Sequence, residues 1–179
     1  MGYLCEASRS SLIVIDLQEK LMPVITDGAG IVRRALILAQ AARLLDVPVI
    51  GTVQQPMRLG DTVREIKLMF DNTFDKIDFD ACTNPAFLNS MEQNRDELIV
   101  LGCEAHVCVL QTVLGLLHRK RHVKLVVDAI GSRQNFNKQA AIERAHSAGA
   151  EIVTSEMVIF EWMRSSEHSK FREILKLIK

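Results

Sequence analysis

The chain lacks features that define several large classes of proteins. None of its apolar runs approaches the roughly 20 residues that a membrane-spanning helix requires. Its N-terminus has no basic region followed by a long apolar stretch, so we predict no secretory signal. We therefore expect no membrane association.

Neither sign of charge is in excess, because 22 Lys and Arg residues are matched by 22 Asp and Glu residues. Aromatic residues, on which single-stranded bases stack, make up only 5% of the chain. The one basic cluster, residues 118–122, is either a solvated helix end or an RNA-binding patch, and we expect the former. Nucleic acid is therefore not an expected partner.

Cysteine is scarce, and no two cysteines form a C-x-x-C pair. The pattern predicts free thiols in a reduced, cytoplasmic compartment, with a mitochondrial location left open. His118 and His122 are four residues apart but lack the Glu of an H-E-x-x-H zinc motif, so we expect a solvated pair. We predict neither a metal nor a cofactor. The four cysteines are Cys5, Cys82, Cys103 and Cys108.

Strand and helix patterns alternate along the chain. Residues 31–45 and 137–148 have helical spacing, and the second segment ends before Gly149, a natural helix terminator. This alternation predicts a three-layer α/β domain with a mainly parallel sheet, and the length of 179 residues predicts one domain over 1–179. Apolar runs rich in β-branched residues predict strands at 11–15, 48–53, 97–101, 123–127 and 151–154.

The most informative segment is Gly102–Val109, which follows the apolar run 97–101 and precedes a predicted helix at 109–117. Cys108 therefore falls where a strand gives way to a helix. The unpaired N–H groups at a helix N-terminus favour thiolate over thiol, so Cys108 is a candidate nucleophile. The ordinary alternative is a buried, unreactive cysteine.

Two further candidates accompany Cys108, and the first of them lies at the predicted carboxyl end of a strand, where open α/β sheets bind ligands. Asp16 follows the first apolar run directly, and its alternative role is to cap a loop. Lys76 lies among acidic and aromatic residues in Phe74–Asp80, where the alternative is an exposed ion pair. Together with Cys108 they supply a base, a cation and a thiol.

Asp16, Lys76 and Cys108 occur in the order found in the isochorismatase-like cysteine hydrolases, and the chain resembles that family over nearly its whole length. Residues 14–18 resemble the first-strand motif of the family, and residues 52–60 resemble its T-E-Q-Y-P…L-G segment. Residues 102–112 match its nucleophile motif, the most specific of the three. The resemblance implies a Rossmann-like fold with about six strands.

The resemblance also implies the site. Asp16, Lys76 and Cys108 would be catalytic, the Cys103–Glu104 peptide bond would be cis, and the amides of Glu104 and Cys108 would form an oxyanion hole. His106 could contact substrate or be a hydrogen-bonded structural residue. The chain would form a dimer, tetramer or octamer. Candidates for the substrate pocket are Gln18, Gln54, Phe79, Cys103 and His106.

The expected activity is hydrolysis of a small-molecule amide or ester through a thioester on Cys108, with Asp16 as base and acid and with Lys76 stabilising the thiolate. Nicotinamidases of the family bind a metal through an Asp-x-His pair, which residues 52–58 lack. Isochorismatases that cleave a vinyl ether need no thiol, so Cys108 favours amide or ester cleavage.

Two rival functions remain open. The first is a scaffold of the same fold with weak or no activity, which could associate through residues 157–163, although most of these are expected in the core. The second is ribonuclease activity, which some relatives are described as having. The balanced charge argues against the second rival.

Overall fold

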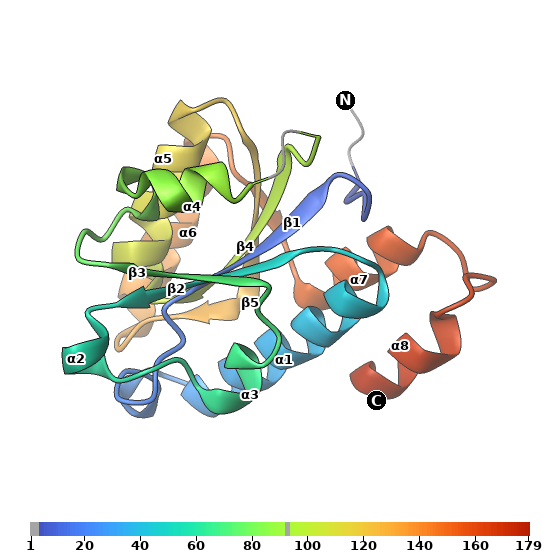
Figure 1. The fold of residues 1–179 in the computed structure, drawn as a ribbon, viewed down its shortest axis with the longest axis horizontal. Coiled ribbons are helices and arrows are strands. Elements are labelled where there is room, and N and C mark those ends of the chain that lie inside the picture. The colour runs from blue at the N-terminus through green and yellow to red at the C-terminus, as the bar shows by residue number, and fades with distance from the viewer. Residues whose placement is uncertain (1–3, 92–93) are drawn as a thin grey trace.

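The computed structural model describes residues 4–91 and 94–179, so the first three residues of the segment assessed for a signal lie outside it. The described residues contain one six-stranded sheet, in the order β3-β2-β1-β4-β5-β6, and every pairing is parallel (Figure 1). The predicted parallel α/β architecture is confirmed. The strands are β1 (Ser10–Ile15), β2 (Val49–Gln54), β3 (Asn72–Lys76), β4 (Glu97–Cys103), β5 (His122–Gly131) and β6 (Glu151–Val153).

Helices cover both faces of this sheet and complete three layers (Figure 1). One face carries α1 (Gly28–Leu44), α3 (Arg64–Lys67), α7 (Ser155–Met163) and α8 (Phe171–Ile178). The other carries α4 (Pro85–Asn89), α5 (Leu110–His118) and α6 (Asn135–Ser147). Shorter segments are α2 (Pro56–Leu59), the 3-10 turns η1 (Met22–Val24) and η2 (Ala81–Thr83), and the π-helical turn η3 (Ala105–Val109).

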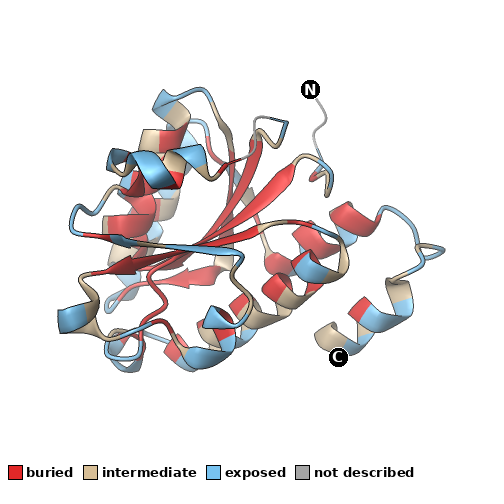
Figure 2. Cartoon of the chain, viewed as in Figure 1, coloured by how far each residue is buried: buried red, intermediate tan, exposed pale blue. Residues whose placement is uncertain are grey.

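Position in the sheet explains the composition of each strand. Every residue of β1 and β4 is buried, because these central strands have a neighbour on each side and helices over each face (Figure 2). Strand β3 lies at the edge, and only its last residue, Lys76, is buried. This is why β3 carries no apolar run and was not among the five strands predicted by range.

The two helices predicted from spacing are present with shifted ends. Helix α1 begins at Gly28, three residues before the predicted start, and buries one Ala- and Leu-rich face that includes Ala35, Leu38 and Ala42. Helix α6 ends at Ser147, and Gly149 has a φ of 109°, which confirms that glycine as the terminating residue.

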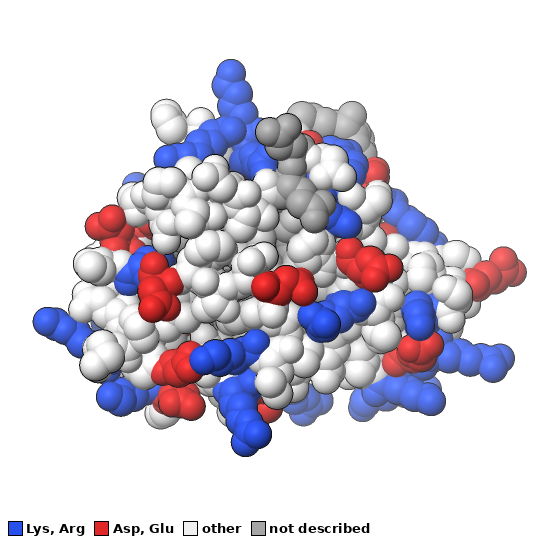
Figure 3. All heavy atoms as spheres, in the orientation of Figure 1, with Lys and Arg blue, Asp and Glu red and all other residues white. Residues whose placement is uncertain are grey.

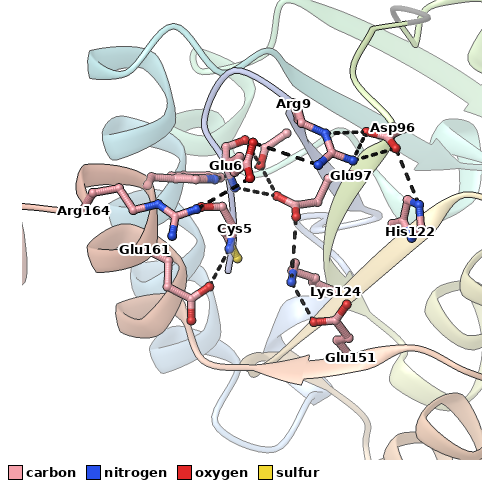
Figure 4. A network of polar contacts seen from close by, with 12 residues as sticks. Cys5, Glu6, Arg9, Asp96, Glu97, His122, Lys124, Glu151, Glu161 and Arg164 are labelled. Carbon is pink, nitrogen blue, oxygen red and sulfur yellow. Dashed lines mark hydrogen bonds and ion pairs between the residues drawn. The ribbon is translucent and has the colours of Figure 1, made fainter. Parts of the chain in front are cut away.

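A polar network lies at the amino end of β4 and β5, away from the carboxyl ends (Figure 4). Lys124 is buried, with its Nζ 2.7 Å from Glu151 Oε2 and 3.8 Å from Glu97 Oε2. Burial lowers the pKa of Lys124, but the hydrogen bond that Lys124 donates to Glu151 and the nearby Glu97 carboxylate raise it by more, so the net shift is upward. Arg9 pairs with Asp96 at 2.8 Å and lowers the pKa of that carboxyl group. The contacts in this network offset the free-energy cost of removing these charged side chains from water.

Charges of both signs are interspersed on the face shown in Figure 3, and no single-sign patch dominates it. Within the described ranges, no helix is long and apolar enough to cross a bilayer. In residues 157–163, Val158, Ile159, Trp162 and Met163 are buried and Met157 and Phe160 are exposed, so most of that segment belongs to the core.

Candidate active site

Asp16 is fully buried at the carboxyl end of β1, in a left-handed conformation with a φ of 48°. Its backbone N–H donates to the Thr52 carbonyl at 3.2 Å. One carboxylate oxygen, Oδ1, accepts from the Thr52 hydroxyl at 2.7 Å, and the other, Oδ2, accepts from Lys76 Nζ at 2.6 Å. Both oxygens therefore face hydrogen-bond donors, as an ionised carboxylate requires.

Lys76 is the last residue of the edge strand β3, and its side chain is only 3% exposed. Because β2 lies between β3 and β1, the lysine reaches across β2 to pair with Asp16. Its Nζ also donates to Gln54 Oε1 at 2.6 Å and, more weakly, to the Asp78 carbonyl at 3.4 Å. The alternative of an exposed ion pair for Lys76 is therefore wrong.

Cys108 lies in the π-helical turn η3, which connects β4 to α5. The predicted helix after the nucleophile thus has two parts, η3 and an α-helix that begins at Leu110. Besides burial, the Asp16 carboxylate raises the pKa of the Cys108 thiol and the Lys76 ammonium lowers it, so the thiol lies within electrostatic reach of both groups. At 7% exposure it is the most accessible of the four thiols, all of which are free and buried.

Close backbone packing brings the β4 end against Asp16. Gly102 has a φ of 126°, and a Cβ built on it would lie 2.0 Å from the carbonyl oxygen of Ile15, the residue before Asp16. Only glycine fits this conformation and this contact. Gly102 thereby lets the end of β4, which leads into the Cys108 turn η3, pack against the end of β1, which leads into Asp16.

The electrostatics of Cys108 differ from the sequence expectation. Burial, with a further contribution from the Asp16 carboxylate, raises the pKa of the Cys108 thiol to about 12, and Lys76 lowers it by less than these effects raise it. The expected resting thiolate is therefore corrected to a neutral thiol. A nucleophile of this kind must lose its proton as it attacks, and Asp16 is a candidate to accept that proton.

The turn that carries Cys108 is held by contacts with one neighbouring loop. The Cys103–Glu104 peptide bond is cis. The Glu104 carboxylate accepts from the Arg133 backbone N–H at 3.0 Å and from Arg133 Nε at 3.1 Å. His106 Nδ1 lies 3.0 Å from Ser132 Oγ. These contacts anchor the turn to the loop between β5 and α6.

The candidate pocket residues fall into different environments. Gln18 is fully buried and uses its amide on backbone groups, donating to the carbonyls of Gln54 and Gly60 and accepting from the Gln54 N–H. Cys103 is also fully buried. Phe79 is half exposed, and His106 is bound to Ser132. Gln54 accepts a hydrogen bond from Lys76, which links it directly to the candidate catalytic groups.

Thr52 is a site residue that the sequence did not single out, although it lies in the segment 52–60. It touches Asp16 because the parallel register places it opposite Ile15, a relationship that requires the strand order. A surface hollow of about 420 Å³ is lined by Lys76 but by neither Asp16 nor Cys108. Within the described ranges, no group of three His, Cys, Asp or Glu residues could hold a metal ion.

Comparison with known proteins defines the class. The model of the Isochorismatase domain family matches residues 10–157. Mouse isochorismatase domain-containing protein 2A is 37% identical over 172 residues, which is 95% of this chain and 82% of the mouse protein. Isochorismatase family protein 1B of Dictyostelium discoideum is 34% identical and covers 95% of this chain and 86% of its own length.

A solved structure agrees with the sequence comparison. The MAR1 ribonuclease of Caenorhabditis elegans superimposes with a TM-score of 0.93 and 38% identity, covering 98% of this chain and 92% of the other. The chain belongs to the isochorismatase family. Membership of this family supports hydrolase activity in general.

Proposed function

We propose that the protein hydrolyses an amide or ester bond of a small molecule through a thioester on Cys108. The observation that carries this proposal is the convergence of three buried groups at the carboxyl end of the sheet: Asp16 just after β1, Lys76 at the end of β3, and Cys108 in the turn η3 that follows β4. A buried carboxylate paired with an ammonium and close to a thiol is suited to acyl transfer.

In the first half of the reaction, the Cys108 sulfur attacks the substrate carbonyl carbon as its proton passes to Asp16. The carbonyl π electrons move to oxygen, where the backbone N–H groups of Glu104 and Cys108 stabilise the negative charge by about 3 kcal/mol per donor. The intermediate collapses as the C–N or C–O bond breaks. The leaving amine or alcohol takes the proton from Asp16, and an acyl-thioester remains.

In the second half, Asp16 accepts a proton from water while the water oxygen attacks the thioester carbon. The C–S bond breaks, and the sulfur recovers its proton from Asp16. The products are a carboxylic acid and the amine or alcohol, with one water consumed. Lys76 takes no part in these proton transfers, and its ammonium group holds Asp16 and Gln54 in place through hydrogen bonds.

The test is a screen of small primary amides and esters, with release of ammonia, amine or alcohol as the readout. We expect turnover of at least one compound class, a covalent acyl adduct on Cys108 by mass spectrometry, and loss of both in Cys108→Ala. Cys82→Ala is the matched control, because it removes another buried thiol, one that contacts the Thr112 carbonyl. A complete absence of turnover and adduct across the screen would favour the scaffold alternative.

Ribonuclease activity is a second candidate, because the similar C. elegans protein is described as a ribonuclease. Equal numbers of basic and acidic residues give no overall attraction to phosphates. Cleavage of RNA that survives Cys108→Ala would support this second candidate over the thioester route. Assembly into a dimer, tetramer or octamer stays a prediction, which sedimentation of the purified protein would test.

A further inference from the structure

Strand β2 lies between β1, which leads into Asp16, and β3, which carries Lys76. Two side chains near the carboxyl end of β2 contact the ion pair of these residues. In the parallel register Thr52 is opposite Ile15, and Gln54 is opposite Lys76. Thr52 and Gln54 are two residues apart on one strand and therefore point to the same face of the sheet. Both are almost fully buried, with 1% and 4% exposure.

Each of these side chains contacts a different member of the ion pair. The Thr52 hydroxyl donates to Asp16 Oδ1 at 2.7 Å, while Lys76 donates to Oδ2. Since a threonine hydroxyl has a single proton, this contact commits that proton to the carboxylate. The Thr52 contact therefore favours the ionised form of Asp16, the form that can accept the Cys108 proton.

Gln54 is held in one orientation. Its Nε2 donates to the Ile77 carbonyl at 2.6 Å, and its backbone N–H donates to Gln18 Oε1 at 2.9 Å. The amide oxygen is thereby turned toward Lys76 Nζ, from which it accepts at 2.6 Å. An acceptor fixed at this point takes one ammonium proton of Lys76 and helps to hold the ammonium group where it donates another to Asp16.

We propose that Thr52 and Gln54 are positioning residues that act through Asp16 and Lys76, holding the carboxylate ionised and oriented so that it accepts the Cys108 proton. This inference rests on the proposed function and deepens it. Thr52 controls the protonation of the base, and Gln54 controls the position of the lysine. Neither residue needs to touch the substrate.

The experiment measures the rate of Cys108 alkylation by iodoacetamide between pH 4 and pH 9, with the site of modification read by mass spectrometry. The variants are Thr52→Val, which keeps the shape and removes the hydroxyl, and Thr52→Ser, which restores it. Thr62→Val is the matched control, because the buried Thr62 hydroxyl has no hydrogen-bond partner among the residues described. Gln54→Met removes the acceptor for Lys76 and provides a second, independent variant.

We expect Thr52→Val to move the acid limb of the rate profile to higher pH by about one unit, because a hydrogen bond to a charged group is lost. Thr52→Ser and Thr62→Val should leave the limb in place, and Gln54→Met should move it in the same direction as Thr52→Val. A limb that stays fixed in both Thr52→Val and Gln54→Met, or moves equally in Thr52→Ser, would overturn the inference.

Asp16→Asn, measured alongside, distinguishes a failure of the positioning roles of Thr52 and Gln54 from a failure of Asp16 as the base. If Asp16→Asn removes the acid limb while Thr52→Val and Gln54→Met leave it unchanged, only the positioning roles fail. If Asp16→Asn leaves the limb intact, Asp16 is not the base, and the proposed function fails together with the inference.

Discussion

Lys76 Nζ lies 2.6 Å from Asp16 Oδ2, although the strands that carry the two residues are separated by β2. The Lys76 side chain is 3% exposed and the Asp16 side chain is fully buried. Two opposite charges removed from water in this way stabilise each other only as long as both are present. The pair is therefore a structural element of the domain as well as the centre of the proposed chemistry.

Removing one member of this pair should cost more than removing both. Lys76→Met leaves the Asp16 carboxylate buried with Thr52 as its remaining side-chain donor, and we expect the free energy of unfolding to fall by about 3–5 kcal/mol. In the double variant Asp16→Asn with Lys76→Met, no unpaired charge remains, so part of that loss should be recovered. Urea unfolding of the single and double variants measures the coupling, and strictly additive losses would contradict it.

Lys124 offers a similar test at the opposite end of the strands. Lys124→Met leaves the buried Glu97 without its neighbouring cation, and we expect a loss of about 3–5 kcal/mol of stability. The rate of Cys108 alkylation in the folded variant should remain that of the parent protein, because the network does not reach the carboxyl ends (Figure 4). A variant of unchanged stability would show that the Lys124 contacts contribute little.

Substitution of Gly102 by alanine should destabilise the protein far more than the same substitution at Gly149, which also has a positive φ. Gly102 and Gly149 both have positive φ, but a Cβ at Gly102 would strike the β1 backbone, and a Cβ at Gly149 has nothing within 4 Å. We expect Gly149→Ala to cost about 1–2 kcal/mol from conformation alone. Gly102→Ala should cost clearly more and should slow Cys108 alkylation, as thermal unfolding and labelling would show. Equal costs would mean that the close approach to Ile15 is unimportant.

Alkaline pH should destabilise the protein through its buried thiols. Burial raises the pKa of Cys82, Cys103 and Cys108 from 9.0 to about 12. Between these values the unfolded chain releases protons that the folded chain retains, so stability is complete below pH 9 and falls as pH rises toward 12.

The slope of that loss identifies the groups responsible. Cys82→Ala removes one of the shifted thiols, so its free energy of unfolding should fall less steeply above pH 9, by up to about 1.4 kcal/mol per pH unit. Urea unfolding at several pH values between 8 and 11 measures both slopes. Identical slopes in Cys82→Ala and the parent chain would exclude this thiol as a contributor.

The sequence predicted the buried part of the fold well, because central strands must be apolar along their whole length. Strand β3 was not predicted, because an edge strand with one buried residue carries no apolar run. The catalytic candidates were found because each lies in or directly after a recognisable segment. The roles of Thr52 and Gln54 were not, because they depend on which strands are neighbours, and that order is a property of the folded sheet.

The charge state of Cys108 could not be predicted from the sequence either. A position near a helix start and a lysine both favour a thiolate, but the extent of burial and the contact with Asp16 reverse the balance. The resting site therefore holds a neutral thiol. Under the proposed mechanism this thiol passes its proton to Asp16, which makes the carboxylate the most informative residue to change.

The most direct measurement is the rate at which iodoacetamide modifies Cys108 at pH 7 in the parent protein and in Asp16→Asn. If Asp16 is the base, the variant should react more slowly, by about a hundredfold or more. If the thiol instead ionises on its own, removing the carboxylate lowers the pKa of Cys108, because Asp16 raises it, and the variant should react faster. A faster or unchanged rate in Asp16→Asn would contradict the proposed mechanism.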